Sequence, residues 1–309
     1  MSSRDDIAFT VFKDFKSGDI IQSKTTSSAL TVFRWSWATK ALALLPPSVP
    51  TSASSRMATV WDGAFSSTRA ATASNVSMEP RAFAPSVLLA YGIIKNEDWL
   101  FKIPDELSDE EAAPLMCAGA TVFNVLYTYG VKPTDRVGVI GVGALGHLAI
   151  QFASKMGCDV LAFSSTESKE SDALFFGASA YYTTQSSKDA KIGRLLDWLI
   201  VTASAPPDWS IYLPLLAPKA KIFPLTIGPG NLAMPSMPLL LNGSTVQGSV
   251  LSPRIVHERM LDFAVRHGIK PVVHRLTMNR DGVEQAFGVL KEGKMKYRGV
   301  LVVPEQERR

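Results

Sequence analysis

Hydrophobic and polar positions follow their clearest rhythm in the second half of the chain, where short apolar runs alternate with segments of helical spacing. The predicted strands cover residues 136–140, 159–165, 197–204, 220–227 and 245–251. The helices between and after them cover residues 144–157, 170–178 and 252–268. Strands that alternate with helices form a parallel sheet covered on both faces. The pattern therefore predicts an α/β fold with a doubly wound Rossmann sheet.

The segments that flank this alternation predict further elements. Ser108 and Glu111 have the spacing of a capping box, and the helix that they open runs to near Gly130. Near the N-terminus, residues 7–22 predict two short strands joined by a glycine turn. The C-terminal end predicts a strand, a helix and a strand at residues 272–278, 282–293 and 297–303.

Residues 25–90 differ from the rest of the chain. They are rich in Ala, Ser, Thr and Pro and show neither a strand rhythm nor a capped helix. Read one base out of register, with permitted codon choices, the stretch from Ser36 spells Val-Leu-Gly-His-Glu-Gly-Val-Gly-Val-Val, and that from Met57 spells Gly-Asp-Arg-Val-Gly-Trp-Gly. One hypothesis is that much of residues 33–75 is a frameshifted translation, and the alternative is a divergent surface segment.

Composition and charge narrow the class of protein. The 309 residues are 46% hydrophobic and 19% charged, which is typical of a globular chain with one large or two ordinary domains. The net charge of +4, without a run of Lys or Arg, gives no support for a nucleic-acid partner. No apolar run reaches the roughly 18 residues of a membrane span. Two cysteines and acidic residues near the N-terminus favour a cytoplasmic protein without a secretory signal.

The strongest chemical signal is a G-x-G-x-x-G loop formed by Gly141, Gly143 and Gly146, which follows a predicted strand and opens a predicted helix. Gly141 permits a tight turn, Gly143 lets a pyrophosphate approach the backbone, and Gly146 lets helix and strand pack closely. The helix N-terminus favours negative charge. The loop therefore predicts a dinucleotide site, and a glycine-rich turn that binds nothing is the alternative.

The end of the second predicted strand bears on which dinucleotide is bound. Proteins that bind NAD usually place an acidic residue here for the ribose hydroxyls. This chain has Ser164, Ser165 and Lys169, which suit a 2′-phosphate and favour NADP. Glu167 is the counterargument, because it could be the missing acid. The segment could also merely cap and solvate the next helix. A methyltransferase is disfavoured, since it normally uses a carboxylate for the ribose.

Three segments carry a resemblance to a known family: IPDELSDEEAAPLMCAGATVF, VGVIGVGALGHLAIQFASKMG and GKMKYRGVLVV. Together they resemble the zinc-type medium-chain alcohol dehydrogenases, in particular the NADP-dependent branch similar to cinnamyl alcohol dehydrogenases. The resemblance implies a Rossmann domain inserted into a β-rich, GroES-like catalytic domain. The implied division is 1–24 for N-terminal strands of the catalytic domain, 25–90 for the atypical segment, 91–117 for a catalytic-domain remnant and the following helix, 118–267 for the NADP-binding domain, and 268–309 for the return to the catalytic domain.

The resemblance also implies roles for particular residues. Those that would contact NADP are Ser164, Ser165 and Lys169 at the 2′-phosphate, Arg298 at the pyrophosphate and Thr121 near the nicotinamide. Cys117 corresponds to one ligand of the catalytic zinc, and a buried helix cysteine is the alternative. The family's other ligands lie upstream, but the first cysteine here is Cys117 and the first histidine is His147. One thiolate cannot hold a catalytic zinc, so this chain is not expected to bind one.

By resemblance, the expected function is an NADP(H)-dependent alcohol dehydrogenase or aldehyde reductase, impaired by the loss of zinc ligands. Its substrate would be a small-molecule aldehyde or alcohol. The alternatives are a zinc-independent quinone or enoyl reductase of the same superfamily and a catalytically inactive NADP-binding protein. The family also suggests a homodimer, with STVQGSVL as the candidate edge strand.

Overall fold

The computed structural model describes residues 100–187, 190–225 and 231–302, together with three short strands further upstream. The chain divides into two units. Unit 1 consists of Met1–Cys117, Pro253–Leu261 and Val272–Arg309, and unit 2 of Ala118–Ser252 and Asp262–Pro271. No helix in the described ranges is long and apolar enough to cross a membrane.

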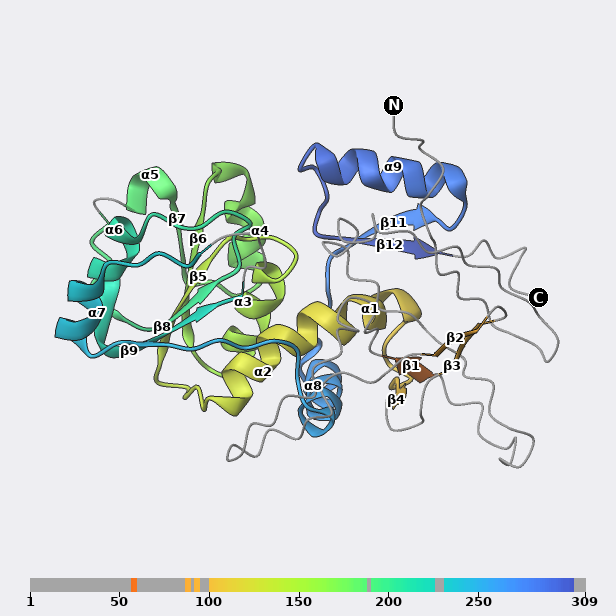
Figure 1. Ribbon diagram of the computed structural model, residues 1–309, viewed down its shortest axis with the longest axis horizontal. Helices are drawn as coiled ribbons and strands as arrows, with labels where there is room; N and C mark the ends of the chain where they lie inside the picture. Colours follow the sequence, from red (N-terminus) through yellow and green to blue (C-terminus); the bar gives the residue numbers. More distant parts are fainter. Residues whose placement is uncertain are drawn as a thin grey trace. The chain divides into compact units, whose positions relative to one another are not determined.

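Unit 2 is built on a six-stranded parallel sheet (Figure 1). Its strands are β5 (Arg136–Ile140), β6 (Asp159–Ser164), β7 (Ala180–Thr183), β8 (Leu196–Val201), β9 (Leu216–Pro224) and β10 (Thr245–Val246). The strand order is β10-β9-β8-β5-β6-β7. The chain moves from β5 out to β7 and then starts again on the other side of β5, so the strand order reverses between β5 and β8. This Rossmann-like sheet confirms the α/β class predicted from the alternating pattern.

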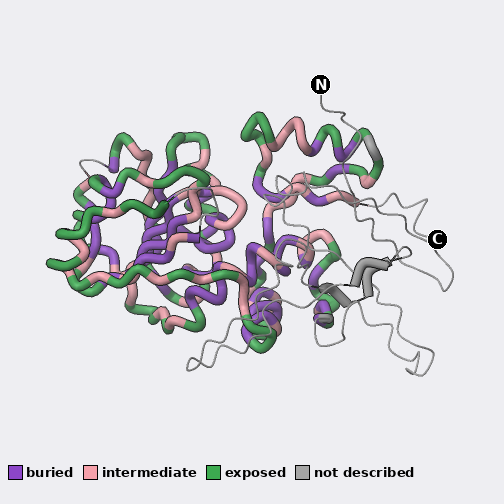
Figure 2. Tube along the Cα trace, viewed as in Figure 1, coloured by how far each residue is buried: buried purple, intermediate pink, exposed green. Residues whose placement is uncertain are grey.

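Helices cover both faces of the sheet (Figure 1). One face carries α2 (Ala120–Thr128), α3 (Gly146–Lys155) and α4 (Glu170–Phe175), and the other carries α5 (Thr184–Ser187), α6 (Trp209–Tyr212) and α7 (Ser236–Asn242). After its first residue, each of β5 and β6 is buried along its whole length, and Figure 2 shows burial concentrated on these central strands. Burial on both faces explains why these strands are nearly continuous apolar runs in the sequence.

Aromatic rings fill the space beside α2 and α3. Phe123 of α2 lies edge-on to Phe152 of α3, with ring centroids 5.3 Å apart. Phe263, in the part of α8 (Arg254–His267) that belongs to unit 2, lies 5.5 Å from Phe123 and 6.1 Å from Phe152. Rings at these distances attract each other in addition to burying apolar area. They hold α3 against its neighbours and so help to fix the loop at its start.

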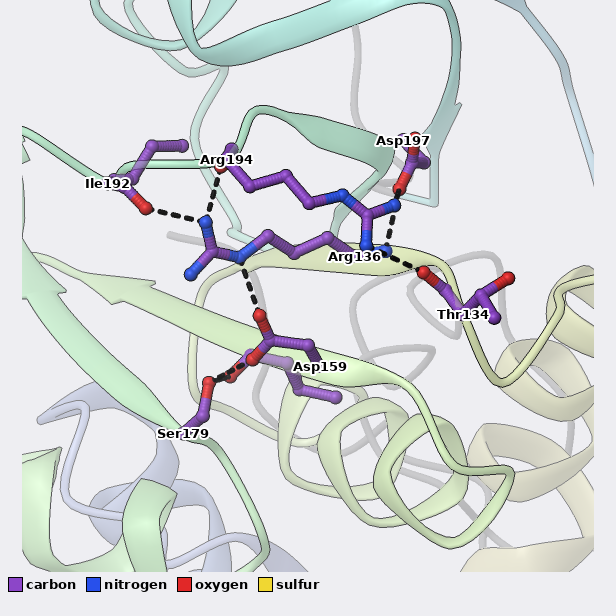
Figure 3. Close-up of polar contacts among 8 residues, drawn as sticks. Thr134, Arg136, Asp159, Ser179, Ile192, Arg194 and Asp197 are labelled. Carbon is purple, nitrogen blue, oxygen red and sulfur yellow. Dashed lines mark hydrogen bonds and ion pairs between the residues drawn. The ribbon is translucent and has the colours of Figure 1, made fainter.

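Ion pairs and hydrogen bonds of charged side chains link the amino-terminal ends of the central strands (Figure 3). The Arg136 side chain, 14% exposed, pairs through Nε with Asp159 of β6 at 2.7 Å and also donates to the carbonyl oxygen of Arg194. Asp159 accepts a hydrogen bond from Ser179, just before β7. Asp197 of β8 accepts from the Arg136 backbone N–H at 2.8 Å. Removal of one partner would leave a largely buried charge uncompensated, so this network holds four strands in lateral order.

Unit 1 contains short two-stranded sheets and helices. Strands β11 (Val273–Thr277) and β12 (Arg298–Val302) pair in parallel, and α9 (Arg280–Lys291) connects them. Helix α1 (Asp109–Pro114) begins with the predicted capping box: Glu111 N–H donates to Ser108 Oγ at 3.2 Å, and Ser108 N–H donates to Glu111 Oε2 at 2.9 Å. Three further strands, β1 (Met57–Thr59), β2 (Val87–Leu89) and β3 (Gly92–Ile94), join β4 (Leu100–Lys102) in two antiparallel pairs, β1 with β4 and β2 with β3.

Some predicted elements are wrong in detail. The helix opened by the capping box is not uniform, because a π-helix at Leu115–Gly119 separates α1 from α2. The apolar spacing of a helix does not distinguish these hydrogen-bond patterns. The strand predicted at 245–251 ends at Val246. Sequence pattern also missed β7 and the short helices α5, α6 and α7, which are too short to display a period.

Most of what the sequence predicts for the upstream segment stays a prediction. Strands β1 and β2 fall within residues 25–90, where the hydrophobic pattern gave no strand. The strands predicted at 7–22, and most of the stretch that the frameshift hypothesis concerns, lie outside the described residues. The domain boundaries inferred from the resemblance, including the β-rich catalytic remnant, also remain predictions.

We expect a buried histidine to make the stability of unit 1 depend on pH. His257 of α8 is 2% exposed and stacks on Phe101 of β4 with centroids 4.4 Å apart. Burial, helped by the charge of Arg254, lowers the pKa of His257 to about 3. Because the pKa in the unfolded chain is about 6.5, the unfolded chain takes up the proton first as pH falls.

We therefore predict that the free energy of unfolding is highest above pH 6.5 and declines below it, by up to about 1.4 kcal/mol per pH unit from this group. His257→Phe keeps the ring stacking and removes the proton uptake, so its decline should be shallower. Urea unfolding at pH 7.5, 6 and 5 measures both slopes. Equal slopes in the two proteins would show that His257 does not cause the acid sensitivity.

Candidate functional site

The glycine loop connects β5 to α3 at the carboxyl end of the sheet, beside the point where the strand order reverses. The N–H of Gly141 donates to the carbonyl oxygen of Phe163 in β6 at 2.7 Å. The N–H of Thr202, directly after β8, donates to the carbonyl oxygen of Ile140 at 2.8 Å. The loop is thus held between the ends of two neighbouring strands, where open α/β sheets bind their ligands.

The three glycines meet different surroundings. Gly141 has a φ of +96°, and a Cβ on it would lie 2.7 Å from the backbone nitrogen of Ala203. A Cβ on Gly146 would lie 1.7 Å from the carbonyl oxygen of Gly141, so α3 packs too closely on the loop to admit any side chain. At Gly143, apart from the residue itself and its two chain neighbours, no described atom lies within 4 Å of where a Cβ would be, and φ is not positive. The fold therefore requires the first and third glycines, whereas the second leaves open space suited to a phosphate.

Two residues that sequence reasoning did not assign to the site hold the loop in place. Thr202 Oγ1 donates to the Gly141 carbonyl oxygen at 2.7 Å and lies 3.0 Å from that of Ile140. His147, fully buried in the first turn of α3, has Nδ1 2.8 Å from the Gly143 carbonyl oxygen. Both side chains bond to carbonyl groups of the loop. The groups that attract an anion at a helix N-terminus are instead the backbone amides. A threonine after a strand and a histidine after a glycine are too common to be recognised beforehand.

The predicted 2′-phosphate residues lie at the carboxyl end of β6 and in the turn that follows it. Ser164 ends β6 and is 6% exposed. The pairing of Ile140 with Phe163 places Ser164 opposite Gly141. Ser165 is exposed, and Lys169 is half-buried at the end of the 3₁₀ turn that leads into α4. The structure therefore brings the glycines and the predicted serines to one edge of the sheet.

The other predicted residues are distributed between the units. Thr121 lies in the first turn of α2, in unit 2. Arg298 and Cys117 lie together in unit 1, where the Arg298 side chain is hydrogen-bonded to the Cys117 thiol. Burial lowers the pKa of Arg298, and the neighbouring thiol opposes that shift. The described partner of Cys117 is thus a guanidinium, which is a cation.

The residues that the structure describes do not fit a catalytic zinc. Among them, no group of three His, Cys, Asp or Glu side chains could hold a metal ion. The other cysteine, Cys158, is buried and donates to the carbonyl oxygen of Lys132 at 3.4 Å. Burial, and secondarily the charge of Asp135, raises the pKa of Cys158 to about 11, which disfavours the thiolate that ligates metal. A catalytic zinc takes about three protein ligands, and within the described ranges Cys117 is the single candidate.

Comparison with known proteins identifies what the chain is similar to. Residues 144–266 match the family model described as zinc-binding dehydrogenase. The chain is 37% identical over 201 residues to aldehyde reductase AdhA of Synechocystis, covering 65% of this chain and 59% of the relative. It is 33% identical over 210 residues to NADP-dependent alcohol dehydrogenase C 1 of Mycolicibacterium smegmatis, covering 68% and 60%. The chain thus spans about 60% of the length of these curated relatives.

Solved structures agree with this similarity. The cinnamyl alcohol dehydrogenase SbCAD4 of Sorghum bicolor matches with a TM-score of 0.63 and 31% identity, covering 68% of this chain and 60% of that chain. The cinnamyl-type enzyme of Helicobacter pylori, solved in complex with NADP(H), matches with a TM-score of 0.60 and 28% identity, covering 69% and 60%.

The glycines provide a matched pair of variants. Gly146→Ala forces a methyl group into the Gly141 carbonyl oxygen, so we predict a clear loss of stability, about 1–3 kcal/mol or more. Gly143→Ala enters open space, so its melting temperature should stay close to that of the wild type. The same methyl group should weaken dinucleotide binding about tenfold, or ~1.4 kcal/mol. Thermal unfolding and titration with NADPH measure the two effects. A Gly143→Ala variant that binds as tightly as wild type would refute the assignment.

Proposed function

We propose that this chain, which belongs to the zinc-binding medium-chain dehydrogenase family, binds NADP(H) at the carboxyl ends of β5, β6 and β8 and transfers hydride between this cofactor and a small-molecule aldehyde or alcohol. We further propose that turnover is impaired relative to zinc-loaded members. The observation that carries the proposal is the open space at Gly143, between two glycines that the fold itself requires. The fold has no need of a glycine there, but a phosphate close to the backbone does.

The cofactor would be held by groups already in place. Its pyrophosphate would lie over Gly143 at the N-terminus of α3, where backbone amides and the helix dipole favour an anion. Ser164 and Ser165 would donate hydroxyl hydrogens to the 2′-phosphate, and Lys169 would supply the positive charge. When bound, the nicotinamide supplies or accepts the hydride, and the protein's task is to hold and orient it. The roles of Thr121 and Arg298 rest on resemblance alone.

Impairment is proposed because the family's metal has no adequate donor set among the described residues. In such enzymes zinc acts as a Lewis acid on the substrate oxygen. Cys117 is the remaining candidate ligand, but its thiol is hydrogen-bonded to the Arg298 guanidinium, whose charge opposes a nearby dication. No step of the reaction is therefore assigned to zinc in this chain.

The same pairing of Cys117 with Arg298 favours two further functions that share the cofactor site: a zinc-independent reductase of quinones or enoyl compounds, and an NADP-binding protein without turnover. Oxidation of NADPH with a panel of aldehydes, quinones and enoyl compounds, before and after chelation, separates them. Slow aldehyde reduction supports the proposal. Chelation-resistant reduction confined to quinones or enoyl compounds, or binding without any turnover, would replace it.

The choice of cofactor is tested by two neighbouring residues. Lys169→Met removes the charge expected to face the 2′-phosphate, so it should weaken NADPH binding about tenfold and leave NADH binding nearly unchanged. Glu167→Gln, in the same turn, is the matched control and should not weaken NADPH binding. Fluorescence titrations of both variants with both cofactors provide the measurement. If the wild type prefers NADH and Glu167→Gln abolishes that preference, Glu167 is the ribose acceptor and the choice of NADP is wrong.

We also propose that two copies of the chain associate through the β10 edge of unit 2. β10 is the last strand in the order of the sheet. The segment that includes α7 and β10 exposes several large apolar side chains: Leu232, Met237, Leu240, Leu241, Val246 and Val250. A sheet edge bordered by exposed apolar residues is suited to pairing with another chain. A second copy offers the same edge, so the two could extend one sheet.

Sedimentation velocity at micromolar concentrations should find a dimer of the wild type. Leu240→Glu, which places a charge at a side chain that is 72% exposed, should give a monomer with an unchanged melting temperature. Phe175→Glu is the control, because Phe175 is 86% exposed on α4, away from this edge, and the variant should stay dimeric. A wild type that is monomeric at all concentrations, or a dimer that persists in Leu240→Glu, would contradict the interface.

A further inference from the structure

A tyrosine on β7 forms a hydrogen bond with the turn that follows β6. The hydroxyl of Tyr181 donates to the carbonyl oxygen of Thr166, two residues beyond the end of β6. The Ser164 side chain is hydrogen-bonded to the same hydroxyl group. Tyr181 pairs with Ala162 in the parallel register of β6 and β7, so its place beside the turn is fixed by the sheet. One phenol group therefore joins the beginning and the end of the turn 164–166.

A second hydroxyl from the same side supports the first. Thr184, directly after β7, donates through Oγ1 to the carbonyl oxygen of Ser164 at 3.2 Å. Within the turn, Thr166 Oγ1 lies 3.2 Å from Ser168 Oγ. The side chain of Ser164 is thus engaged by Tyr181 within β7, and its backbone by Thr184 just beyond the end of that strand. The shape of the turn depends on β7 as well as on its own residues.

The charge state of the phenol suits a hydrogen-bond donor. Burial raises the pKa of Tyr181 above its usual value near 10, and the charges of Glu170 and Glu167 raise it as well, while the hydrogen bond with Ser164 opposes the shift. The group therefore keeps its proton at neutral pH. A protonated phenol can donate to the Thr166 carbonyl oxygen while its own oxygen accepts from Ser164.

We infer that Tyr181 is a positioning residue for the 2′-phosphate of the cofactor: it holds Ser164 and the turn 164–166 in the arrangement that receives this group. The inference rests on the proposed binding of NADP(H). Without the phenol hydroxyl, the buried side chain of Ser164 loses its partner and the turn loses its tie to β7. The serine hydroxyls then have to be ordered when the ligand binds, which lowers affinity for the 2′-phosphate in particular.

Tyr182 offers a matched control. It is the next residue of β7 and stacks on Phe163 with ring centroids 5.6 Å apart and an interplanar angle of 22°. Its ring therefore contributes to packing against β6. Loss of the Tyr182 hydroxyl removes the same atom from the same strand without touching the turn.

The experiment compares wild type, Tyr181→Phe and Tyr182→Phe by calorimetric titration with 2′,5′-ADP and with 5′-AMP, which differ only in the 2′-phosphate. Tyr181→Phe should weaken 2′,5′-ADP about five- to tenfold, the size of one lost hydrogen bond. Its binding of 5′-AMP should change by less than about twofold, and Tyr182→Phe should change neither. The melting temperatures of all three proteins show whether each variant is folded.

The outcomes separate this inference from the proposal beneath it. Equal weakening of both ligands by Tyr181→Phe would mean that the hydroxyl supports the fold in general, and unchanged affinity for 2′,5′-ADP would mean that it does not position the site. Either result overturns the inference while the NADP(H) proposal stands. A wild type that binds neither ligand overturns both.

Discussion

The candidate site depends on how closely α3 approaches the end of β5. A methyl group on Gly146 would lie 1.7 Å from the Gly141 carbonyl oxygen, so the helix begins in contact with the backbone of the loop that precedes it. This contact keeps the N-terminus of α3 close to the carboxyl end of β5. The hydrogen bonds of the loop to Phe163 and Thr202 then place it between β6 and β8. Backbone amides and the predicted serines meet there because β5 pairs with both neighbouring strands.

The parts of the fold that sequence could predict are those governed by strong local rules. The buried strands β5, β6 and β8 are nearly continuous apolar runs, and Ser108 with Glu111 forms the capping box that their spacing indicates. The family suggested by three sequence segments is confirmed by the comparisons. The π-helix at Leu115–Gly119 escaped prediction because it depends on a hydrogen-bond register, which apolar spacing does not encode.

Contacts between segments that are distant in the chain could not be predicted from the sequence either. Thr202 reaches the glycine loop from β8, and Tyr181 reaches the turn after β6 from β7. Each contact follows from parallel strand pairing, and neither residue type is unusual at its position. The strand predicted at 245–251 ended early for a related reason: β-propensity does not tell how far a strand pairs at the edge of a sheet. The predicted roles of the individual site residues stay predictions.

Cofactor binding and catalysis place separate demands on this chain. Unit 2 has the parallel sheet and the glycine loop that are typical of dinucleotide sites, and the turn after β6 to which we assign the 2′-phosphate. In unit 1, Cys117 is paired with Arg298, and no metal-binding group occurs among the residues described there. The account therefore separates the proposed affinity for NADP(H), which it assigns to unit 2, from the rate of hydride transfer.

Calorimetric titration of the full chain with NADPH, before and after dialysis against a chelator, tests this account most directly. The account predicts saturable binding of one NADPH per chain, with the same affinity in both preparations. Absence of saturable binding in either preparation, or binding that chelation abolishes, would contradict it.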